Sequence, residues 1–275
     1  MTDSLTELIN KRFPTGTNIV GNRAARGTHA LQLKHRSFRN FEARPVNTET
    51  LELLLACALS APSKSDLQQG TIIHVADKDA RDFIQNAIPS MPWIKSAPEF
   101  FLFCGDSRRI RKICECHNIN FSHDPIDSLI NATTDAAMLL QNFIIAAEAE
   151  GLGSCPISAV REVTDKIAHF FNLPEGVFPI AGLCLGYTNE EPEIKVRLPM
   201  TITVHKNKYN DTRFTEELVE YDKVRNIKNP IKEQRHTEIF GHDQNYSWSL
   251  DKARQTSQVE RTAFSSFIRK NGFDL

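Results

Sequence analysis

The chain has 275 residues, of which 40% are hydrophobic, 24% charged and 8% aromatic. This is the composition of an ordinary globular protein, and it excludes disordered, collagen-like and low-complexity chains. The 33 Lys and Arg nearly balance the 34 Asp and Glu. The basic excess of a nucleic-acid-binding protein is therefore missing, and we expect no nucleic-acid partner. No apolar run reaches the length of a membrane span, so we also expect no membrane contact.

Elements in the first half of the chain follow from hydrophobic spacing and turn residues. Residues 1–34 are polar and mixed, which predicts a helix followed by an extension. The patterns that follow predict, in chain order, a helix at 48–60 capped by Thr48, a strand at 71–76, a helix at 80–87, a Pro-broken loop at 89–98 and a buried strand at 100–105.

The segment 132–151 is helical in pattern and apolar on nearly every face. Such a helix is expected to be buried all round, in a core or against a partner chain. Gly151 is the residue expected to end it in a left-handed conformation.

The second half predicts fewer strands and a long tail. In chain order we expect a turn at 151–160, a helix at 161–172, a buried strand at 180–186, an alternating strand at 201–206, a helix at 215–225 and a last helix at 249–270. Strands alternating with helices in one domain, followed by a helical tail, indicate a mixed α/β or α+β fold.

The cysteines and the N-terminus indicate the compartment. The six cysteines follow no regular spacing, and residues 1–16 lack the apolar core of a signal peptide. We therefore expect reduced thiols and a cytoplasmic protein. Cys114, Cys116 and His117, with His123 nearby, could supply zinc ligands, but their spacing matches no zinc pattern, and we expect no metal site.

Two cationic segments are candidates for binding an anion. Residues 35–39 (HRSFR) carry Arg36 and Arg39, which converge at i, i+3 if the segment forms the first turn of a helix. Arginines at a helix N-terminus form a natural phosphate site, whereas the alternative is a solvated basic turn. Lys195 and Arg197 share one side of an extended chain. Together the two pairs could neutralise a phosphate of about −1.5 to −2 charges.

Other motifs do not indicate side-chain catalysis. GLGSCP (151–156) differs from a dinucleotide fingerprint because a helix precedes it and Pro156 takes the place of the last glycine. Ser63 and Gln68 lie in a polar loop without an adjacent base. The polar groups suit a phosphorylated, planar ligand, such as a cofactor that brings its own reactivity.

These segments together resemble the FMN-dependent nitroreductase family, in particular its larger, NADPH-preferring branch that includes flavin reductases. The resemblance runs from about residue 31 to the C-terminus. The matching segments stand in family order: HRSFR (35–39), ACALSAPSKSDLQ (56–68), APEFFLFC (97–104), AAEAEGLGSCPIS (146–158), NLPEGVFPIAGLCLGY (172–187), KVRLP (195–199) and VHKNKY (204–209).

The resemblance implies an α+β, three-layer fold with a mostly antiparallel central sheet flanked by helices, in a domain-swapped homodimer with two FMN sites at the subunit interface. The sheet would gain an edge strand from the partner, and helix 132–151 would pack against its twin. In this interpretation residues 1–30 form an N-terminal extension, 31–209 the FMN-binding core, and 210–275 a helical tail that wraps the partner subunit.

The resemblance also assigns site residues. His35, Arg36, Ser37 and Arg39 would hold the FMN phosphate and ribityl chain, with Lys195 and Arg197 completing the phosphate site. Ser63 and Gln68 would come from the partner subunit or face the flavin edge. Backbone groups of Pro156, Ile157, Ser158 and Ala159 would line the ring. Relatives often carry Gly-Gly at 158–159 and Gln at the position of Met91, so one hydrogen bond at the flavin edge is missing.

The activity implied is ping-pong hydride transfer from NADPH through flavin N5 to nitroaromatics, quinones or free flavin, with FMN tightly bound and no catalytic side chain. Arg225 resembles the tail arginine that this branch uses for the NADPH 2′-phosphate, although a solvated helix face explains it equally. Three alternatives remain open: a flavin-sequestering or regulatory flavoprotein with little turnover, a reductive dehalogenase of the same superfamily, and a thiol or metal protein built on Cys114, Cys116 and His117.

Overall fold

The computed structural model describes residues 4–15 and 27–273. Contacts within the chain divide it into two compact units. Unit 1 comprises residues 1–36 and 193–260, and unit 2 comprises residues 37–192 and 261–275. Arg36, Lys195 and Arg197 therefore belong to the same unit, although they are far apart in sequence.

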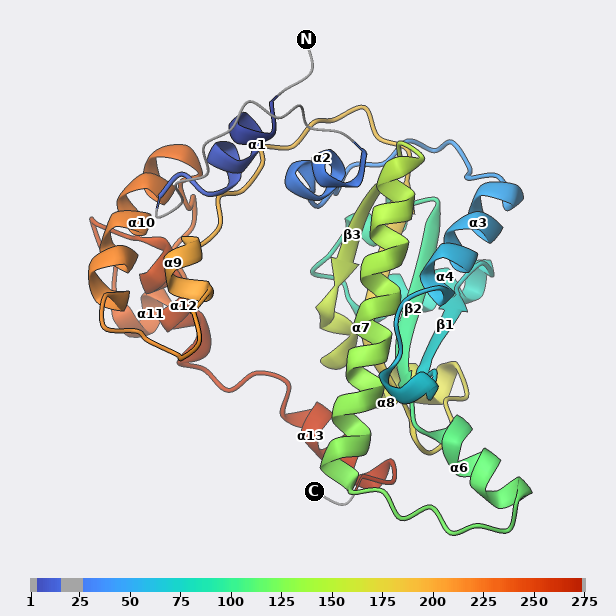
Figure 1. Ribbon diagram of the computed structural model, residues 1–275. Coiled ribbons are helices and arrows are strands. Elements are labelled where there is room, and N and C mark those ends of the chain that lie inside the picture. Colours follow the sequence, from blue (N-terminus) through green and yellow to red (C-terminus); the bar gives the residue numbers. More distant parts are fainter. Residues whose placement is uncertain (1–3, 16–26, 274–275) are drawn as a thin grey trace. The chain divides into compact units, whose positions relative to one another are not determined.

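A four-stranded antiparallel sheet lies at the centre of unit 2 (Figure 1). The strands, in sheet order, are β1 (Gly70–His74), β2 (Glu99–Asp106), β4 (Val177–Gly186) and β3 (Gly153–Ile157). Side chains of β2 alternate between two buried faces: Phe100 and Leu102 join one apolar cluster, and Phe101 and Phe103 the other. A sheet buried on both faces requires a helical layer on each side.

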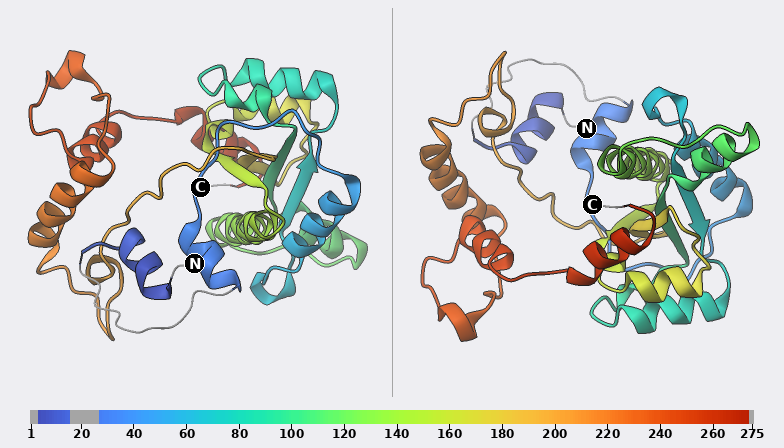
Figure 2. Two further views of the ribbon diagram at one scale, coloured as in Figure 1. Left: turned by 90° about the horizontal axis from the view of Figure 1, so that it is seen from above. Right: turned by 90° about the horizontal axis from the view of Figure 1, so that it is seen from below.

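Helices supply those two layers (Figure 2). One face packs against α3 (Thr48–Leu59) and α7 (Pro125–Ala149), and the other against α4 (Lys78–Ala87), α5 (Trp93–Ser96) and α8 (Thr164–Phe170). Unit 2 also contains α6 (Arg108–Cys116), α13 (Thr262–Lys270) and the short 3₁₀ turns Lys64–Asp66 and Ser158–Arg161. The α+β, three-layer architecture with an antiparallel sheet is thus confirmed.

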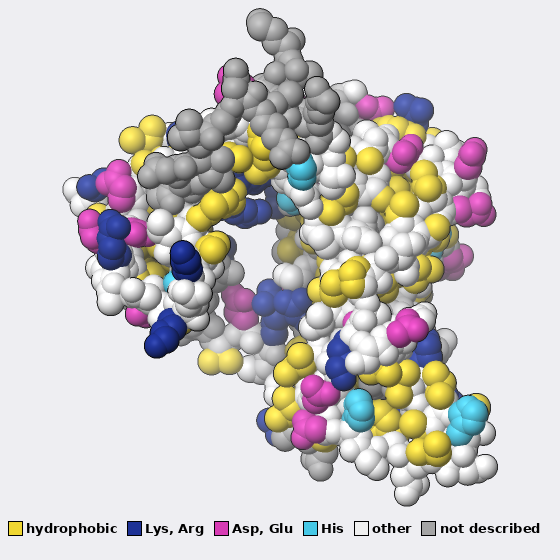
Figure 3. All heavy atoms as spheres, in the orientation of Figure 1, with side chains coloured by type: hydrophobic (Ala, Val, Ile, Leu, Met, Phe, Trp, Pro, Cys, Tyr) yellow, Lys and Arg dark blue, Asp and Glu magenta, His cyan; other side chains and the backbone are white. Residues whose placement is uncertain are grey.

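Helix α7 is longer than predicted and is buried on one side only. It begins after the cap Asp124, whose side chain accepts a hydrogen bond from the Asp127 amide, and Gly151 follows it with a φ of +74°. Within the predicted segment Thr134, Ala137 and Gln141 are exposed, so the chain's own core does not bury the helix all round, and burial against a partner chain stays a prediction. Figure 3 shows hydrophobic side chains among polar ones on the α3 and α7 face.

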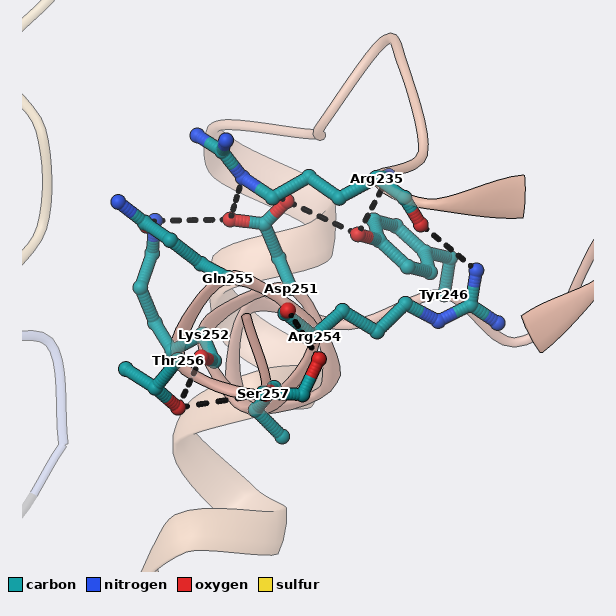
Figure 4. Close-up of polar contacts among 9 residues, drawn as sticks. Arg235, Tyr246, Asp251, Lys252, Arg254, Gln255, Thr256 and Ser257 are labelled. Atoms are coloured by element: carbon teal, nitrogen blue, oxygen red, sulfur yellow. Dashed lines mark hydrogen bonds and ion pairs between the residues drawn. The ribbon is translucent and has the colours of Figure 1, made fainter. Parts of the chain in front are cut away.

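The described residues of unit 1 form helices joined by irregular segments, and none of its elements is a strand. It contains α1 (Leu5–Arg12), α2 (Gly27–Lys34), α9 (Met200–Thr203), α10 (Phe214–Lys228), α11 (Thr237–Phe240) and α12 (Trp248–Thr256). The rings of Tyr221 and Trp248 meet edge-on at 5.2 Å between centroids. Asp251 on α12 binds the Arg235, Tyr246 and Lys252 side chains (Figure 4).

Several predicted elements need correction. Residues 201–206 form no strand: Met200–Thr203 is helical, and Val204 is 68% exposed. The turn predicted at 151–160 contains the edge strand β3. The extension predicted before residue 34 includes α2.

Two helix ends also differ from the prediction. Asn47, not Thr48, caps α3, since its side chain accepts from the Thr50 amide at 2.7 Å. The last helix is two helices, α12 and α13, because Arg261 takes a left-handed φ of +58° between them. In the described part of the chain, no helix is long and apolar enough to cross a membrane.

Candidate functional site

The segment 35–39 follows a helix instead of beginning one. Helix α2 ends at Lys34, and residues 35–40 have no regular structure. The predicted convergence of Arg36 and Arg39 in a first helical turn is therefore wrong, and no helix N-terminus contributes there. The segment is fixed by other means: the Phe38 amide donates to the Ser154 carbonyl of β3 at 2.9 Å.

Arg12 binds the backbones of two segments of unit 1, residues 33–35 and 195–197. Its Nε and Nη2 donate to the Leu33 carbonyl at 3.3 and 3.0 Å, and Nη2 also donates to the His35 carbonyl. Nη1 donates to the Lys195 carbonyl at 3.0 Å. The Arg12 carbonyl in turn accepts from the Arg197 amide at 2.8 Å. Segments 33–35 and 195–197 are therefore held side by side.

The segment 195–197 is also held from α10. Val196 is 3% exposed, whereas Lys195 and Arg197 are exposed on either side of it, so the predicted alternation is confirmed. The Val196 amide donates to Asn229 Oδ1 at 3.0 Å, and its carbonyl accepts from the Tyr221 hydroxyl at 3.3 Å. The two cationic side chains thus extend from a fixed backbone.

A pocket of about 500 Å³ opens beside this arrangement. Its polar lining includes His35 and Arg197, and its apolar lining includes Ile9, Phe13 and Met200. The Lys195 ammonium lies 3.7 Å from Glu193, and both side chains are more than half exposed. An exposed pair of this kind contributes little stability and leaves Lys195 able to exchange partners.

In unit 2 the loop after α3 is organised by one buried carboxylate. Asp135 of α7 is 3% exposed. It accepts from the Ser63 hydroxyl at 2.7 Å and from the amides of Lys64 and Gln69 at 3.1 and 2.8 Å. The Ser63 oxygen also accepts from the Gln68 amide at 2.7 Å. The Ser63 hydroxyl therefore holds the loop, while the Gln68 side chain is exposed and donates to Asp66 at 3.0 Å.

This loop has an unusual backbone. Ser65, Asp66 and Gln68 all have positive φ, between 50° and 59°. Residues other than glycine adopt this conformation at a cost of about 1–3 kcal/mol each and keep it where the surroundings enforce it. Such strain clusters at ligand-binding positions, which agrees with the assignment of Ser63 and Gln68 to a site.

The predicted ring-contacting residues lie on β3 and the turn that follows. Ile157 and Ala159 are 1% and 2% exposed, so they can offer a ligand only backbone groups. Pro156 is the one exposed residue of β3, where an edge strand tolerates a proline that lacks the amide donor. The Ser158 hydroxyl lies 3.4 Å from the Arg261 guanidinium, which sequence reasoning did not identify.

The remaining predicted residues have local partners. Arg39 lies over the Trp93 ring, 5.3 Å from its centroid. Met91 packs against the apolar core beneath the sheet. Arg225 donates to Asn229 Oδ1 at 2.7 Å, which links it to the 195–197 segment. Burial raises the pKa of the Cys155 thiol, so this cysteine is not an activated nucleophile.

No group of three or more His, Cys, Asp and Glu residues suited to a metal ion occurs among the described residues. Cys114 and Cys116 lie on α6, and His117 is its C-terminal cap.

Comparison with known proteins identifies the family. The Nitroreductase family model matches residues 33–187, and the model of the nitroreductase C-terminal domain matches residues 195–275. The chain belongs to the nitroreductase family.

Individual relatives of this nitroreductase-family chain match between 70% and 90% of its length. FMN reductase [NAD(P)H] of Bacillus subtilis is 34% identical over 88% of this chain and 95% of its own. Oxygen-insensitive NADPH nitroreductase of Salmonella typhimurium is 34% identical over 70% of this chain and 82% of its own. The solved structure of NfrA2 from B. megaterium superposes with a TM-score of 0.82 at 28% identity, covering 90% and 98% of the two chains.

Sequence reasoning missed two positioning residues of this family member. Arg12 gave no signal, because it contacts carbonyls up to 183 positions away. Asp135 did leave a signal: it stands at helical spacing with Ala132, Ala136 and Leu139, and a charge on a core-facing stripe requires partners.

Proposed function

We propose that the protein is an FMN-dependent NAD(P)H oxidoreductase that prefers NADPH and passes electrons to nitroaromatics, quinones or free flavin. The observation that carries this proposal is the fixing of segments 33–35 and 195–197 by Arg12. It brings together two cationic segments that a phosphate dianion could bridge. The names of the relatives, an FMN reductase and an NADPH nitroreductase among them, support the same activity.

The donor set of unit 1 fits a phosphate ester. His35, Arg36, Lys195 and Arg197 would bind it, and the arginines can donate two parallel hydrogen bonds to its oxygens. Ser37 and Arg39, which belong to unit 2, would contact the ribityl chain. We keep Arg225 as a candidate for the NADPH 2′-phosphate, although its hydrogen bond to Asn229 gives it a second role in the fold.

Other residues of unit 2 would bind the flavin ring. Backbone groups at Pro156, Ile157, Ser158 and Ala159 would line it, and Ser63, Gln68 and Met91 would lie at a flavin edge. Bound FMN supplies the hydride and electron transfer chemistry, and the protein binds, orients and excludes water. We therefore assign no catalytic acid or base.

We further propose a cytoplasmic homodimer in which the tail from residue 210 wraps the partner. The exposed apolar residues of α3 and α7, such as Leu53, Leu59 and Ile130, support a subunit interface on that face. The six unpaired thiols support a reducing compartment.

A spectroscopic titration tests the activity. The purified protein should take up FMN, lose the flavin colour faster with NADPH than with NADH, and regain it with menadione or nitrofurazone. A protein that binds no FMN contradicts the proposal. A flavin that NADPH reduces but neither acceptor reoxidises would favour the flavin-sequestering alternative.

A variant pair tests the assigned phosphate residues. The double variant Lys195→Gln/Arg197→Gln should bind FMN at least about 10-fold more weakly than the wild type, because each charge-assisted hydrogen bond contributes about 1.5–3 kcal/mol. Lys232→Gln removes a charge from an exposed position of the same unit and should leave FMN binding unchanged. Equal affinity for FMN in the wild type, the double variant and the Lys232→Gln control would contradict the assignment.

A further inference from the structure

Arg12 lies outside both segments that the family models match, because the first of these begins at residue 33. Its residue is nevertheless 5% exposed. The guanidinium binds carbonyls of Leu33, His35 and Lys195, and the Arg12 carbonyl accepts from the Arg197 amide. One residue of the N-terminal helix α1 thus contacts both cationic segments of unit 1.

The two segments carry charges of the same sign. Arg36 follows α2 after His35, and Lys195 and Arg197 extend from the opposite segment. Cationic side chains brought together repel one another until an anion lies between them. Backbone contacts that do not depend on the anion are therefore needed to keep the two segments adjacent before it binds.

A guanidinium is suited to this task. It is planar, presents five donors in fixed directions and stays charged at every physiological pH. The guanidinium can bind the Leu33, His35 and Lys195 carbonyls at the same time. A lysine ammonium is a single point charge on a flexible side chain and lacks these fixed donor directions. The positive charge of Arg12 also adds to the local field that an anion would meet.

On the basis of the proposed function, we propose that Arg12 is a positioning residue for the phosphate of the cofactor. It sets the spacing of the two segments so that their side chains can close on one phosphate ester. This gives α1 a role in the site, although α1 lies in the stretch expected to be an extension of the family core.

Riboflavin separates this role from a merely structural one, because it has the ring and ribityl chain of FMN but no phosphate. Arg12→Lys and Arg12→Gln should weaken FMN binding at least 10-fold while changing riboflavin binding less than 2-fold, as measured by quenching of flavin fluorescence. Lys11→Gln removes a charge from the same helix one position earlier and should change neither. Equal losses for both flavins, or no loss for either, would overturn the inference.

Hydrogen exchange in the unaltered protein tests the same inference independently of how the variants fold. The Arg197 amide donates a hydrogen bond to the Arg12 carbonyl. FMN and inorganic phosphate should slow hydrogen exchange of this amide, and riboflavin should not. Exchange that responds equally to riboflavin would overturn the role of Arg12.

The outcome also separates this inference from the proposed function. Wild-type protein that binds riboflavin as tightly as FMN contradicts the phosphate site itself. Wild-type protein that prefers FMN, with the same preference in both Arg12 variants, contradicts only the role of Arg12.

Discussion

Two buried charged residues organise the two units in opposite ways. In unit 2, the Asp135 carboxylate gathers a hydroxyl and two amide donors from a loop of seven residues, 63–69. In unit 1, the Arg12 guanidinium gathers carbonyls from segments that lie more than 150 residues apart. The first fixes the shape of one loop, and the second fixes the distance between two segments.

The difference predicts how each region responds to loss of its charge. The loop held by Asp135 contains three residues with positive φ, so without the carboxylate it would relax to a different backbone conformation. Segment 195–197 has further partners in Asn229 and Tyr221, and would keep its local conformation without Arg12. We therefore expect the largest stability effect at Asp135 and the more selective binding effect at Arg12.

Replacing Asp135 should have the largest effect. Asp135→Ala leaves one hydroxyl and two amides without their acceptor in a buried position, and it should lower the free energy of unfolding by about 3 kcal/mol or more. Urea denaturation measures this. Thr134→Ala, at the exposed neighbouring position of α7, is the control and should cost much less. If the two variants lose the same stability, Asp135 does not hold the loop.

Gly153 tests the contact between segment 37–39 and β3. A Cβ at this position would lie 2.7 Å from Phe38 Cγ and 2.9 Å from Thr188 Cγ2, so Gly153→Ala forces both side chains to move. Overpacking of this kind costs about 1–3 kcal/mol. Thermal unfolding should show the loss.

A second substitution shows whether Phe38 is the cause. Phe38→Ala in the Gly153→Ala background should recover part of the stability, so that the two changes together cost less than their sum. Simple additivity would mean that the close approach of Phe38 does not limit the residue at 153.

Asn229 allows a further test of the comparison, since its side chain binds the Val196 amide of segment 195–197 and the Arg225 and Glu193 side chains. Asn229→Ala removes the acceptor of the buried Val196 amide and should cost about 1–2 kcal/mol. Unlike substitution of Arg12, it should leave the preference for FMN over riboflavin unchanged. Asn229→Asp keeps an acceptor oxygen and should cost less stability. A lost preference for FMN in Asn229→Ala would mean that any loosening of the segment has the same effect as losing Arg12.

The sequence predicts best those elements whose pattern is local and strong. The apolar runs of β2 and β4 and the helical spacing of α3, α4 and α7 were sufficient to place them. Strand β3 was missed because Gly153 and Pro156 are typical of turns. In the structure the glycine allows Phe38 to approach closely, and the proline lies on an edge strand.

Errors elsewhere have related causes. Residues 201–206 have the alternation of a strand, but a strand also needs a neighbour for its backbone groups, and the described residues of this unit provide none. For the candidate site, residue types and spacing predicted the cationic segments and the placement of Lys195 and Arg197 on one side of an extended chain. The residues that hold those segments could not be predicted, since Arg12 and Asn229 act across long sequence separations.

Replacing Asp251 should have the smallest effect on stability. This buried carboxylate differs from Asp135 and Arg12 because its partners are mainly side chains. It is 4% exposed, and its partners are mainly the charged side chains of Arg235 and Lys252, which are 44% and 41% exposed, and the Tyr246 hydroxyl. Burial alone would raise the pKa of the Asp251 carboxyl, but hydrogen bonds from Lys252 and Tyr246 and the nearby positive charges lower it below its usual value.

A carboxyl whose pKa is lower in the folded than in the unfolded chain stabilises the fold at neutral pH, and that stabilisation is lost as the pH falls through the folded value. Asp251→Asn should therefore cost about 1 kcal/mol at pH 7, because its partners stay partly hydrated. The difference from wild type should shrink below pH 4. Urea denaturation at pH 7 and at pH 3 measures both values. If the stability difference between wild type and Asp251→Asn is the same at pH 7 and pH 3, the ionised Asp251 carboxylate contributes no stability through Arg235, Lys252 and Tyr246. In that respect it would differ from the charges of Asp135 and Arg12.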